Sequence, residues 1–286
     1  MIYSILGKTG RKVSRIGFGG ATAGLKNYTG KFDPQQKKDR ESVIAAIHRA
    51  YELGINYFDT AAGYGDGASE EIFGEALSGI LQEEIFLATK ASPAEPLKVR
   101  ASLEKSLKNL KRDSIDLIQI HGSYFSPETG REIFRTNGIL DVLCKAREEG
   151  LVKHLGFSVE CQNEVMYELI RCREFDVMQI EYNLLFQHPY DPFFHCGSLY
   201  DAEKEGLGIV NMRTVTSGIF QKWLHMVNPG NTFDYNGALV QFALSNPLIH
   251  VSLLGMRDVD IVEKNVAVCN DLSGRIDLTQ LHERYI

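Results

Sequence analysis

Short apolar segments alternate with amphipathic segments along nearly the whole chain, and this alternation is the strongest constraint on its fold. The apolar segments are typical of buried strands, and the spacing of apolar residues between them is typical of helices packed on one face. Repeated strand–helix units predict a parallel sheet. We expect strands at residues 14–18, 55–59, 85–90, 114–121, 153–158, 176–181, 206–212 and 250–256. We expect helices at residues 39–53, 68–81, 97–110, 138–149, 163–172, 194–205, 235–245 and 259–269.

The number of strands favours a closed barrel over an open sheet. About eight strand–helix units are typical of the (β/α)8 TIM barrel, although periodicity alone leaves closure open. Ahead of the barrel, residues 2–6 and 13–16 flank a Gly-Lys-Thr-Gly turn and predict an N-terminal β-hairpin. No linker or low-complexity tract interrupts the sequence. We therefore expect an α/β fold with a single barrel domain over residues 1–286.

Composition narrows the class of protein. Hydrophobic residues make up 44% and charged residues 24% of the chain, as in an ordinary soluble enzyme with a sizeable core. The formal net charge of -6 gives no electrostatic reason to expect a nucleic acid or an anionic membrane as partner. No segment approaches the roughly 20 apolar residues of a membrane span, and the N-terminus lacks the features of a signal peptide. The oligomeric state stays open.

The cysteines give no sign of disulfides or of a metal site. They number five, are scattered and lack a CxxC pair: Cys144, Cys161, Cys172, Cys196 and Cys269. This pattern indicates a reducing compartment. We therefore expect a cytoplasmic protein with no bound metal.

Polar side chains end five successive predicted strands. They are Asp59, Lys90, His121, Ser158 and Glu181. Any one of them alone could be structural, as a helix-capping aspartate or a core histidine with satisfied hydrogen bonds. A buried parallel strand has no structural need for such endings, however, and barrel enzymes carry their chemistry at the C-terminal ends of the strands. Their joint placement favours an active site there.

Tyr64 follows Asp59 within the segment DTAAGY. A tyrosine is a poor proton donor at neutral pH because its unperturbed pKa is about 10. The Lys90 ammonium is expected to lower that pKa, and a carboxylate can hold the ammonium in place. His121 could donate a hydrogen bond to a carbonyl or share in proton transfer. This set of groups suits carbonyl reduction, in which the oxygen must be protonated as hydride arrives at the carbon.

These motifs resemble those of the aldo-keto reductase superfamily, in particular its bacterial-type members with a short C-terminal tail. The resemblance covers about residues 5–265. Its landmarks are GFGG (17–20), GINYFDTAAGYG (54–65), Thr89-Lys90, DLIQIH (116–121), LGFS (155–158), QIEYNLL (179–185), GMR (255–257) and Asn265. It implies that Tyr64 is the general acid, that Lys90 and Asp59 tune it, and that His121 orients and polarises the substrate carbonyl.

The resemblance also implies a binding site for a nicotinamide cofactor, NADP in preference to NAD. Ser158 and Gln179 would bind the carboxamide, and Met212 would lie beside the nicotinamide ring. An arginine at 257 could pair with the 2′-phosphate of NADP. Gly20 and Ala21 would lie near the nicotinamide ribose, and Arg213, Val215 and Ser217 would line the pyrophosphate. Asn265 would reach the adenosine end together with Arg257, and Asp59 and Gly255 complete the set of expected cofactor-binding residues.

Three features depart from the usual pattern of the superfamily. Val159 and Glu160 follow Ser158, where most members have an asparagine. Met212 stands where many members stack an aromatic ring on the nicotinamide, although a methionine can also pack on a ring face. The tail after Asn265 is short, so we expect the loops at 122–137 and 214–236, which include Trp223, to select the substrate.

Other functions stay open at this stage. The segment GFGGATAG (17–24) has a threonine where the third glycine of a Rossmann fingerprint belongs, and no helical pattern follows it. A dehydrogenase built on a Rossmann domain is therefore disfavoured. The leading hypothesis is a reductase of an aldehyde, ketone or sugar-type carbonyl. The alternatives are an NAD(P)-dependent sugar or alcohol dehydrogenase that works in the oxidative direction, and a cofactor-binding regulatory subunit on the same fold.

Overall fold

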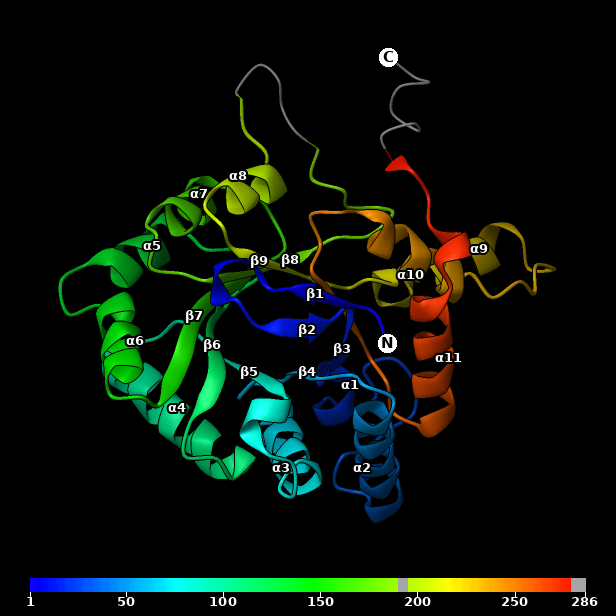
Figure 1. The fold of residues 1–286 in the computed structure, drawn as a ribbon, viewed down its shortest axis with the longest axis horizontal. Helices are drawn as coiled ribbons and strands as arrows, with labels where there is room; N and C mark the ends of the chain where they lie inside the picture. The colour runs from blue at the N-terminus through cyan, green and yellow to red at the C-terminus, as the bar shows by residue number, and fades with distance from the viewer. Residues whose placement is uncertain (190–194, 279–286) are drawn as a thin grey trace.

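Eight parallel strands close into a barrel in the computed structural model, which describes residues 1–189 and 195–278. β3 pairs with both β4 and β10, so the barrel has no free edge. Figure 1 shows the helices arranged around the strands. The prediction of a (β/α)8 fold is therefore confirmed. The barrel strands are β3 (Ile16–Gly19), β4 (Tyr57–Asp59), β5 (Phe86–Ala91), β6 (Ile115–His121), β7 (Val152–Val159), β8 (Val177–Glu181), β9 (Gly208–Met212) and β10 (Val251–Leu254).

Helices surround the barrel. The predicted ones are α2 (Lys37–Glu52), α3 (Ala68–Ala76), α4 (Pro96–Leu110), α6 (Ile139–Glu148), α7 (Glu164–Arg171), α8 (Ser198–Lys204), α10 (Asn236–Ser245) and α11 (Val259–Asn270). For two of these helices, the predicted boundary was wrong. α3 ends before 81, where Arg112 donates to the backbone oxygens of Leu77 and Ile80. α8 begins at Ser198, after the extended Gly197; residue 194, where we expected it to begin, lies outside the described residues.

The predicted N-terminal hairpin is confirmed and closes one end of the barrel. β1 (Tyr3–Ile5) pairs antiparallel with β2 (Lys12–Ser14), joined through the 3-10 turn η1 (Gly7–Thr9). Leu6 and Val13 are fully buried in the same cluster as the side chains that fill the barrel interior. A Cβ on Gly208, the first residue of β9, would lie only 2.6 Å from Leu6 Cγ. The hairpin therefore packs against the N-terminal ends of the strands.

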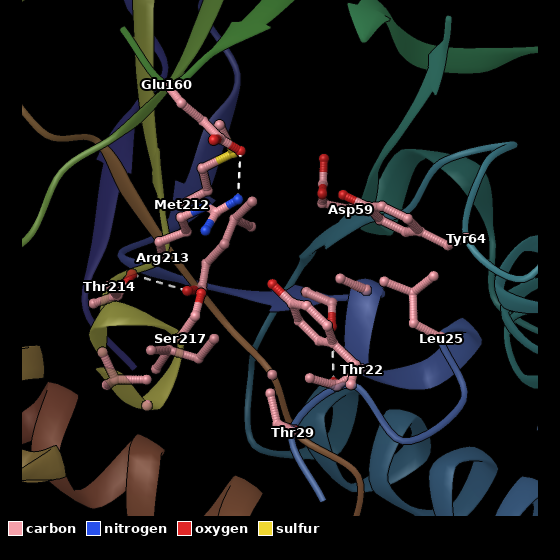
Figure 2. A pocket seen from close by; sticks show the side chains of 18 of the residues that line it. Thr22, Leu25, Thr29, Asp59, Tyr64, Glu160, Met212, Arg213, Thr214 and Ser217 are labelled. Carbon is pink, nitrogen blue, oxygen red and sulfur yellow. Dashed lines mark hydrogen bonds and ion pairs between the residues drawn. The ribbon is translucent and has the colours of Figure 1, made fainter. Parts of the chain in front are cut away.

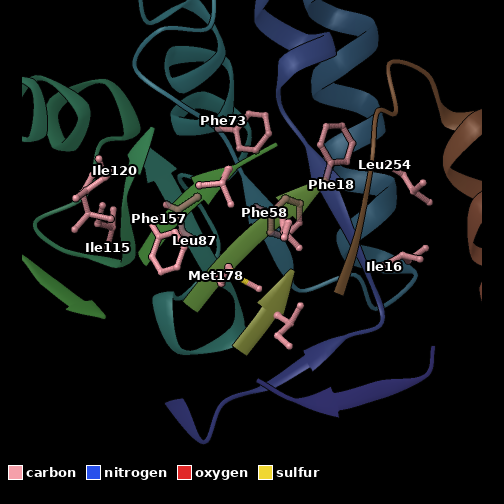
Figure 3. Packing of buried hydrophobic residues seen from close by; sticks show 14 of the residues in the cluster. Ile16, Phe18, Phe58, Phe73, Leu87, Ile115, Ile120, Phe157, Met178 and Leu254 are labelled. Carbon is pink, nitrogen blue, oxygen red and sulfur yellow. The ribbon is translucent and has the colours of Figure 1, made fainter. Parts of the chain in front are cut away.

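The layer between barrel and helices holds large apolar side chains (Figure 3). Phe73 of α3 packs edge-on against Phe18 and Phe58, with ring centroids 5.6 and 6.4 Å away. Burying one such side chain contributes roughly 1.5–3 kcal/mol. Because strand side chains alternate between the two faces, the outward packing of Phe58 turns Asp59 into the barrel. The core thus positions the first candidate site residue.

Three helices occupy segments that we expected to be loops: α1 (Ala21–Gly24), α5 (Pro127–Phe134) and α9 (Ile219–Val227). α1 is a single turn directly after β3. α5 begins at an N-cap, where Ser126 Oγ accepts a hydrogen bond from the Thr129 backbone N–H at 3.2 Å. α9 contains no buried residue, so the sequence has no periodic pattern of core-facing apolar residues that would predict it. All three follow the C-terminal ends of strands and shape the rim of the barrel.

Candidate active site

A cavity of about 840 Å³ opens at the C-terminal ends of the barrel strands (Figure 2). Most of the predicted site residues line it. They are Ala21, Asp59, Tyr64, His121, Ser158, Gln179, Met212, Arg213, Val215, Ser217 and Gly255. Other lining residues were not predicted, among them Tyr28, Glu160 and Lys222. Trp223 does not line the cavity and is 56% exposed.

Lys90 and Asp59 form a buried ion pair at the floor of this site. Lys90 Nζ lies 2.5 Å from Asp59 Oδ1 and donates a second hydrogen bond to the Thr60 carbonyl at 2.8 Å. Burial opposes the charged form of Lys90, but Asp59 and then Tyr64 outweigh it and raise the pKa of the ammonium. Burial raises the pKa of Asp59, while Lys90 and amide donors counteract that rise. The close contact and the hydrogen bonds favour the charged form of each group and so oppose the effect of burial.

Tyr64 lies above this pair at the cavity wall. The Lys90 ammonium is 5.2 Å from the centre of its ring. We expected the lysine to lower the pKa of Tyr64, but burial raises that pKa and outweighs the opposing effect of Lys90. The prediction of a lowered pKa was wrong because it left desolvation out. The phenol is consequently protonated at neutral pH, which is the form that a proton donor needs.

His121 meets Tyr64 edge-to-face, with ring centroids 5.5 Å apart. Burial, and secondarily the Lys90 charge, lowers the pKa of His121 to about 4. The imidazole is therefore neutral at physiological pH and carries one N–H donor. A neutral imidazole at the cavity wall can hydrogen-bond to a substrate oxygen without competing with Tyr64 for the role of acid.

Gln119 is a site residue that the sequence reasoning missed. Its Nε2 donates to Asp59 Oδ2 at 3.2 Å and to Gln179 Oε1 at 3.1 Å. The signal was present in the sequence, because Gln119 precedes His121 by two positions on a buried strand and so points into the barrel with it. Gln179 in turn directs its Nε2 to Met212 Sδ, 3.5 Å away. Both glutamines are buried.

The Ser158 hydroxyl is hydrogen-bonded to the backbone of the loop that follows β6. Its Oγ accepts from the Gly122 N–H at 3.1 Å and lies 3.2 Å from the Gly122 carbonyl, to which it can donate. This exchange ties the loop after β6 to β7. Ser158 lines the cavity, and its hydroxyl already has hydrogen-bond partners.

Arg213 lies at the cavity wall in an ion pair that the sequence reasoning did not foresee. Its guanidinium is 2.6 Å from Glu160 and 4.0 Å from Glu181. Arg213 and Ser217 adopt left-handed backbone angles, with φ of 57° and 51°, which are uncommon for residues other than glycine. The strained turn leads directly into the N-terminus of α9. Helix N-termini bind anions well because their first N–H groups lack partners within the helix.

Four predicted site residues lie outside the cavity lining. Lys90 is beneath it, in contact with Asp59. Gly20 packs on α3, since a Cβ there would lie 2.7 Å from Ser69 Oγ. Arg257 stacks on Phe32, 5.0 Å from the ring centre, and borders Gly30, which does line the cavity. Asn265 lies on α11.

Within residues 1–189 and 195–278, the structure has neither a candidate metal cluster nor a candidate membrane-spanning helix. No group of three or more His, Cys, Asp or Glu side chains there could hold a metal ion. No helix in that part of the chain has the length and apolar character to cross a membrane.

Sequence comparison identifies a protein family and individual proteins to which this chain is similar. The pattern of the aldo/keto reductase family matches residues 15–236. L-galactose dehydrogenase from Arabidopsis thaliana is 26% identical to the chain, over 93% of the chain and 88% of that protein. Probable aldo-keto reductase 1 from Glycine max is 36% identical, but the match spans only 63% of the chain and 51% of that protein.

Solved structures share the fold. An aldo-keto reductase from Bacillus halodurans, in its holo form, superposes with a TM-score of 0.75 at 21% identity, over 98% of this chain and 93% of that one. An aldo-keto reductase from Klebsiella pneumoniae in complex with NADPH gives 0.72 at 19% identity, over 100% and 96%. The family pattern spans most of the chain, and the chain therefore belongs to the aldo/keto reductase family of oxidoreductases.

Proposed function

We propose that this protein is an NADPH-dependent reductase of small carbonyl compounds with Tyr64 as its proton donor. The observation that carries the proposal is the stack of groups at the cavity floor. A protonated tyrosine lies over a buried lysine–aspartate pair, with a neutral histidine at its edge. Each group holds the protonation state that carbonyl reduction requires of it.

The residues divide the chemistry among them. NADPH, when bound, supplies the hydride that adds to the carbonyl carbon. Tyr64 gives its proton to the carbonyl oxygen, and the Lys90 ammonium stabilises the phenolate that remains. Asp59 keeps Lys90 in place and charged. His121 donates a hydrogen bond to the same oxygen and orients the substrate, and Tyr64 then regains a proton from solvent.

The cavity wall has groups that fit a dinucleotide phosphate. Arg213, Ser217, Lys222 and the N-terminus of α9 would hold the pyrophosphate. Arg257 would bind the 2′-phosphate, because its buried Nη1 has no hydrogen-bond partner among the described residues. An unsatisfied buried guanidinium nitrogen is costly, and an incoming phosphate would relieve that cost. The pyrophosphate is common to NAD and NADP, so only the Arg257 fit distinguishes them, and it favours NADP.

Replacing Arg257 tests the choice of cofactor. In Arg257→Ala the ratio of NADH to NADPH dissociation constants should fall at least about tenfold, since a charged hydrogen bond contributes roughly 1.5–3 kcal/mol. Calorimetric titration of both cofactors measures the ratio. Arg49→Ala removes a surface arginine paired with Glu263 and serves as the control. An unchanged ratio in Arg257→Ala would remove the arginine from the phosphate site.

A second candidate is the reverse reaction, oxidation of a sugar. Similarity to L-galactose dehydrogenase over 93% of the chain favours it, because that relative is named for oxidising an aldose. The same residues serve both directions. In that direction Tyr64 must first lose its own proton to solvent, and the phenolate, stabilised by Lys90, then accepts the hydroxyl proton as hydride leaves the carbon.

Turnover assays separate these candidates. NADPH consumption should be measured over aldehydes, quinones and keto-sugars, and NAD(P)⁺ reduction over aldoses that include L-galactose. We expect faster turnover in the reductive panel. Higher kcat/KM for an aldose would support the dehydrogenase. Tight cofactor binding without turnover on any compound would overturn both and favour a regulatory subunit.

A further inference from the structure

The loop between α1 and α2 folds back on itself and is closed at its base. The Asn27 N–H donates to the Phe32 carbonyl at 2.9 Å, and the Phe32 N–H donates to Asn27 Oδ1 at 3.0 Å. Beside this pair, Lys26 Nζ lies 2.6 Å from Asp33 Oδ2. Asn27 has left-handed backbone angles, with φ of 55°, where the chain reverses. These contacts make residues 26–33, the α1–α2 loop, a compact unit whose tip is tied to its base.

The tip of the α1–α2 loop borders the candidate active site. Tyr28, Thr29 and Gly30 line the cavity, and Figure 2 shows Thr29 at its edge. Burial is the main cause of the raised pKa of Tyr64, and the Tyr28 phenol is close enough to raise that pKa further. The substrate carbonyl must lie at Tyr64 to receive its proton, so Tyr28 lies on the substrate side of the cavity.

Arg257 contacts the α1–α2 loop at two points. Its guanidinium lies over the ring of Phe32, 5.0 Å from the ring centre, and Phe32 is only 4% exposed. A Cβ on Gly30 would lie 3.3 Å from Arg257 Nη2, so the arginine also borders the tip. Its other terminal nitrogen, Nη1, is buried without a hydrogen-bond partner among residues 1–189 and 195–278. The arginine therefore packs on the loop and keeps a donor for a ligand.

These contacts connect the site expected for the 2′-phosphate with the substrate side of the cavity. A phosphate bound at Arg257 would fix the guanidinium, and a fixed guanidinium restrains the Phe32 ring against which it packs. The hydrogen bonds between Phe32 and Asn27 extend that restraint to Tyr28. NADH has no 2′-phosphate and would leave the arginine unrestrained. Two ligands that favour the same position of a loop increase each other's affinity.

We propose that Phe32 is a positioning residue that couples the 2′-phosphate site at Arg257 to Tyr28 beside the substrate. The inference rests on the proposed role of Arg257 in binding NADPH. It predicts that the 2′-phosphate orders the whole α1–α2 loop, and that this order lowers the KM of the carbonyl substrate.

Hydrogen exchange with two nucleotides that lack the nicotinamide measures this ordering. Adenosine 2′,5′-bisphosphate has the 2′-phosphate, and adenosine 5′-monophosphate does not. At saturating concentrations, the backbone amides of residues 26–33 should exchange about fivefold more slowly with the bisphosphate than with the monophosphate. Equal exchange with the two nucleotides bound would overturn the proposal. This comparison uses the wild type, so it does not depend on the stability of any variant.

Phe32→Leu removes the aromatic face and keeps a buried apolar side chain. The difference in exchange between the two nucleotides should disappear, while the dissociation constant of the bisphosphate stays within about fivefold of wild type. Phe86→Leu is the matched control, since Phe86 is also buried and lies 5.9 Å from Arg11, in the apolar layer under the hairpin. It should keep the wild-type difference. Persistence of that difference in Phe32→Leu would refute the coupling.

Steady-state kinetics with the best aldehyde substrate provide a second readout. In the wild type, the KM of the aldehyde should be about fivefold lower with NADPH than with NADH. In Phe32→Leu the two KM values should be equal, and kcat with NADPH should stay within about twofold of wild type. A loss confined to kcat would contradict a positioning role. If the bisphosphate binds no more tightly than the monophosphate, the proposed role of Arg257 itself is wrong, which is a different result from equal exchange with both nucleotides bound.

Discussion

The two ends of the barrel interior contrast sharply although the same strands build both. At the N-terminal end the inward side chains are apolar and pack under the hairpin: Tyr57, Phe86, Ala88, Leu117, Val177, Val210 and Val251. Two positions further along, several of these strands turn polar, at Asp59, Lys90, Gln119 and Gln179. The apolar layer holds the barrel together, and the polar layer above it is available for chemistry.

Each end also contains a lysine bound to a buried aspartate. At the site, Lys90 is completely buried against Asp59. At the opposite end, Lys153 pairs with Asp116 at 2.9 Å, but 42% of its side chain is exposed and Arg11 also approaches the carboxylate, at 3.6 Å. The Lys153–Asp116 pair only compensates the charge of a buried carboxylate. The Lys90–Asp59 pair, in contrast, is enclosed beside Tyr64. The contrast teaches that surroundings, rather than residue types, separate a structural pair from a catalytic one.

The largest expected effect comes from Lys90→Met. The variant leaves Asp59 buried without its partner, which should cost roughly 3–5 kcal/mol of unfolding free energy. Tyr64 loses the charge that stabilises its phenolate, so kcat/KM for carbonyl reduction should fall about 10³-fold. Denaturant unfolding and steady-state kinetics measure the two effects.

Lys153→Met is the matched control at the other end of the barrel. Its partly exposed pair should contribute only about 1 kcal/mol, and kcat/KM should stay within about twofold of wild type. Equal losses of activity in the two lysine variants would mean that the contrast between the ends does not hold.

A smaller effect is expected from Leu117→Ala, two residues before Gln119 on β6. The cavity left in the apolar layer should cost about 2–4 kcal/mol of stability. Turnover and cofactor affinity should change by less than about threefold, which corresponds to under 1 kcal/mol. Thermal unfolding and cofactor titration test this. A tenfold loss of cofactor affinity would show that the two layers are coupled.

The smallest effect concerns the pH dependence of stability. The pKa of His121 is about 4 in the folded protein, compared with 6.5 for an unperturbed histidine such as that of the unfolded chain. Between these values the unfolded chain binds more protons, so stability contributed by the neutral imidazole is lost as pH falls from 6.5 to 4. Over that range the Tm of wild type should fall by about 2–4 °C more than that of His121→Gln. Parallel Tm curves would contradict the lowered pKa.

The fold was largely predictable because strand and helix periodicities are local. All eight barrel strands were expected near their observed positions, although β4 is shorter than predicted and begins at Tyr57. α5 and α9 were missed for different reasons. α5 begins at a serine cap followed by proline, a signal that the apolar pattern does not contain. α9 buries no residue and therefore has no core-facing pattern to detect.

The candidate site was predictable where residues end strands and less so where contacts cross the barrel. Asp59, Tyr64 and His121 line one cavity as expected, with Lys90 beneath it. The spacing of Gln119 from His121 indicates that it points into the barrel, but its partners and the Glu160–Arg213 pair lie far apart in sequence, so no local spacing reveals these contacts. The raised pKa of Tyr64 depends on burial, which the sequence could not quantify.

The central claim is that Tyr64 donates the proton, and Tyr64→Phe tests it most directly. The phenylalanine keeps the ring that packs against His121 and removes only the hydroxyl. The rate of hydride transfer in a single turnover, with NADPH prebound, should fall at least about 10³-fold, while the NADPH dissociation constant stays within about twofold of wild type. Retention of more than a tenth of the wild-type rate would contradict the account.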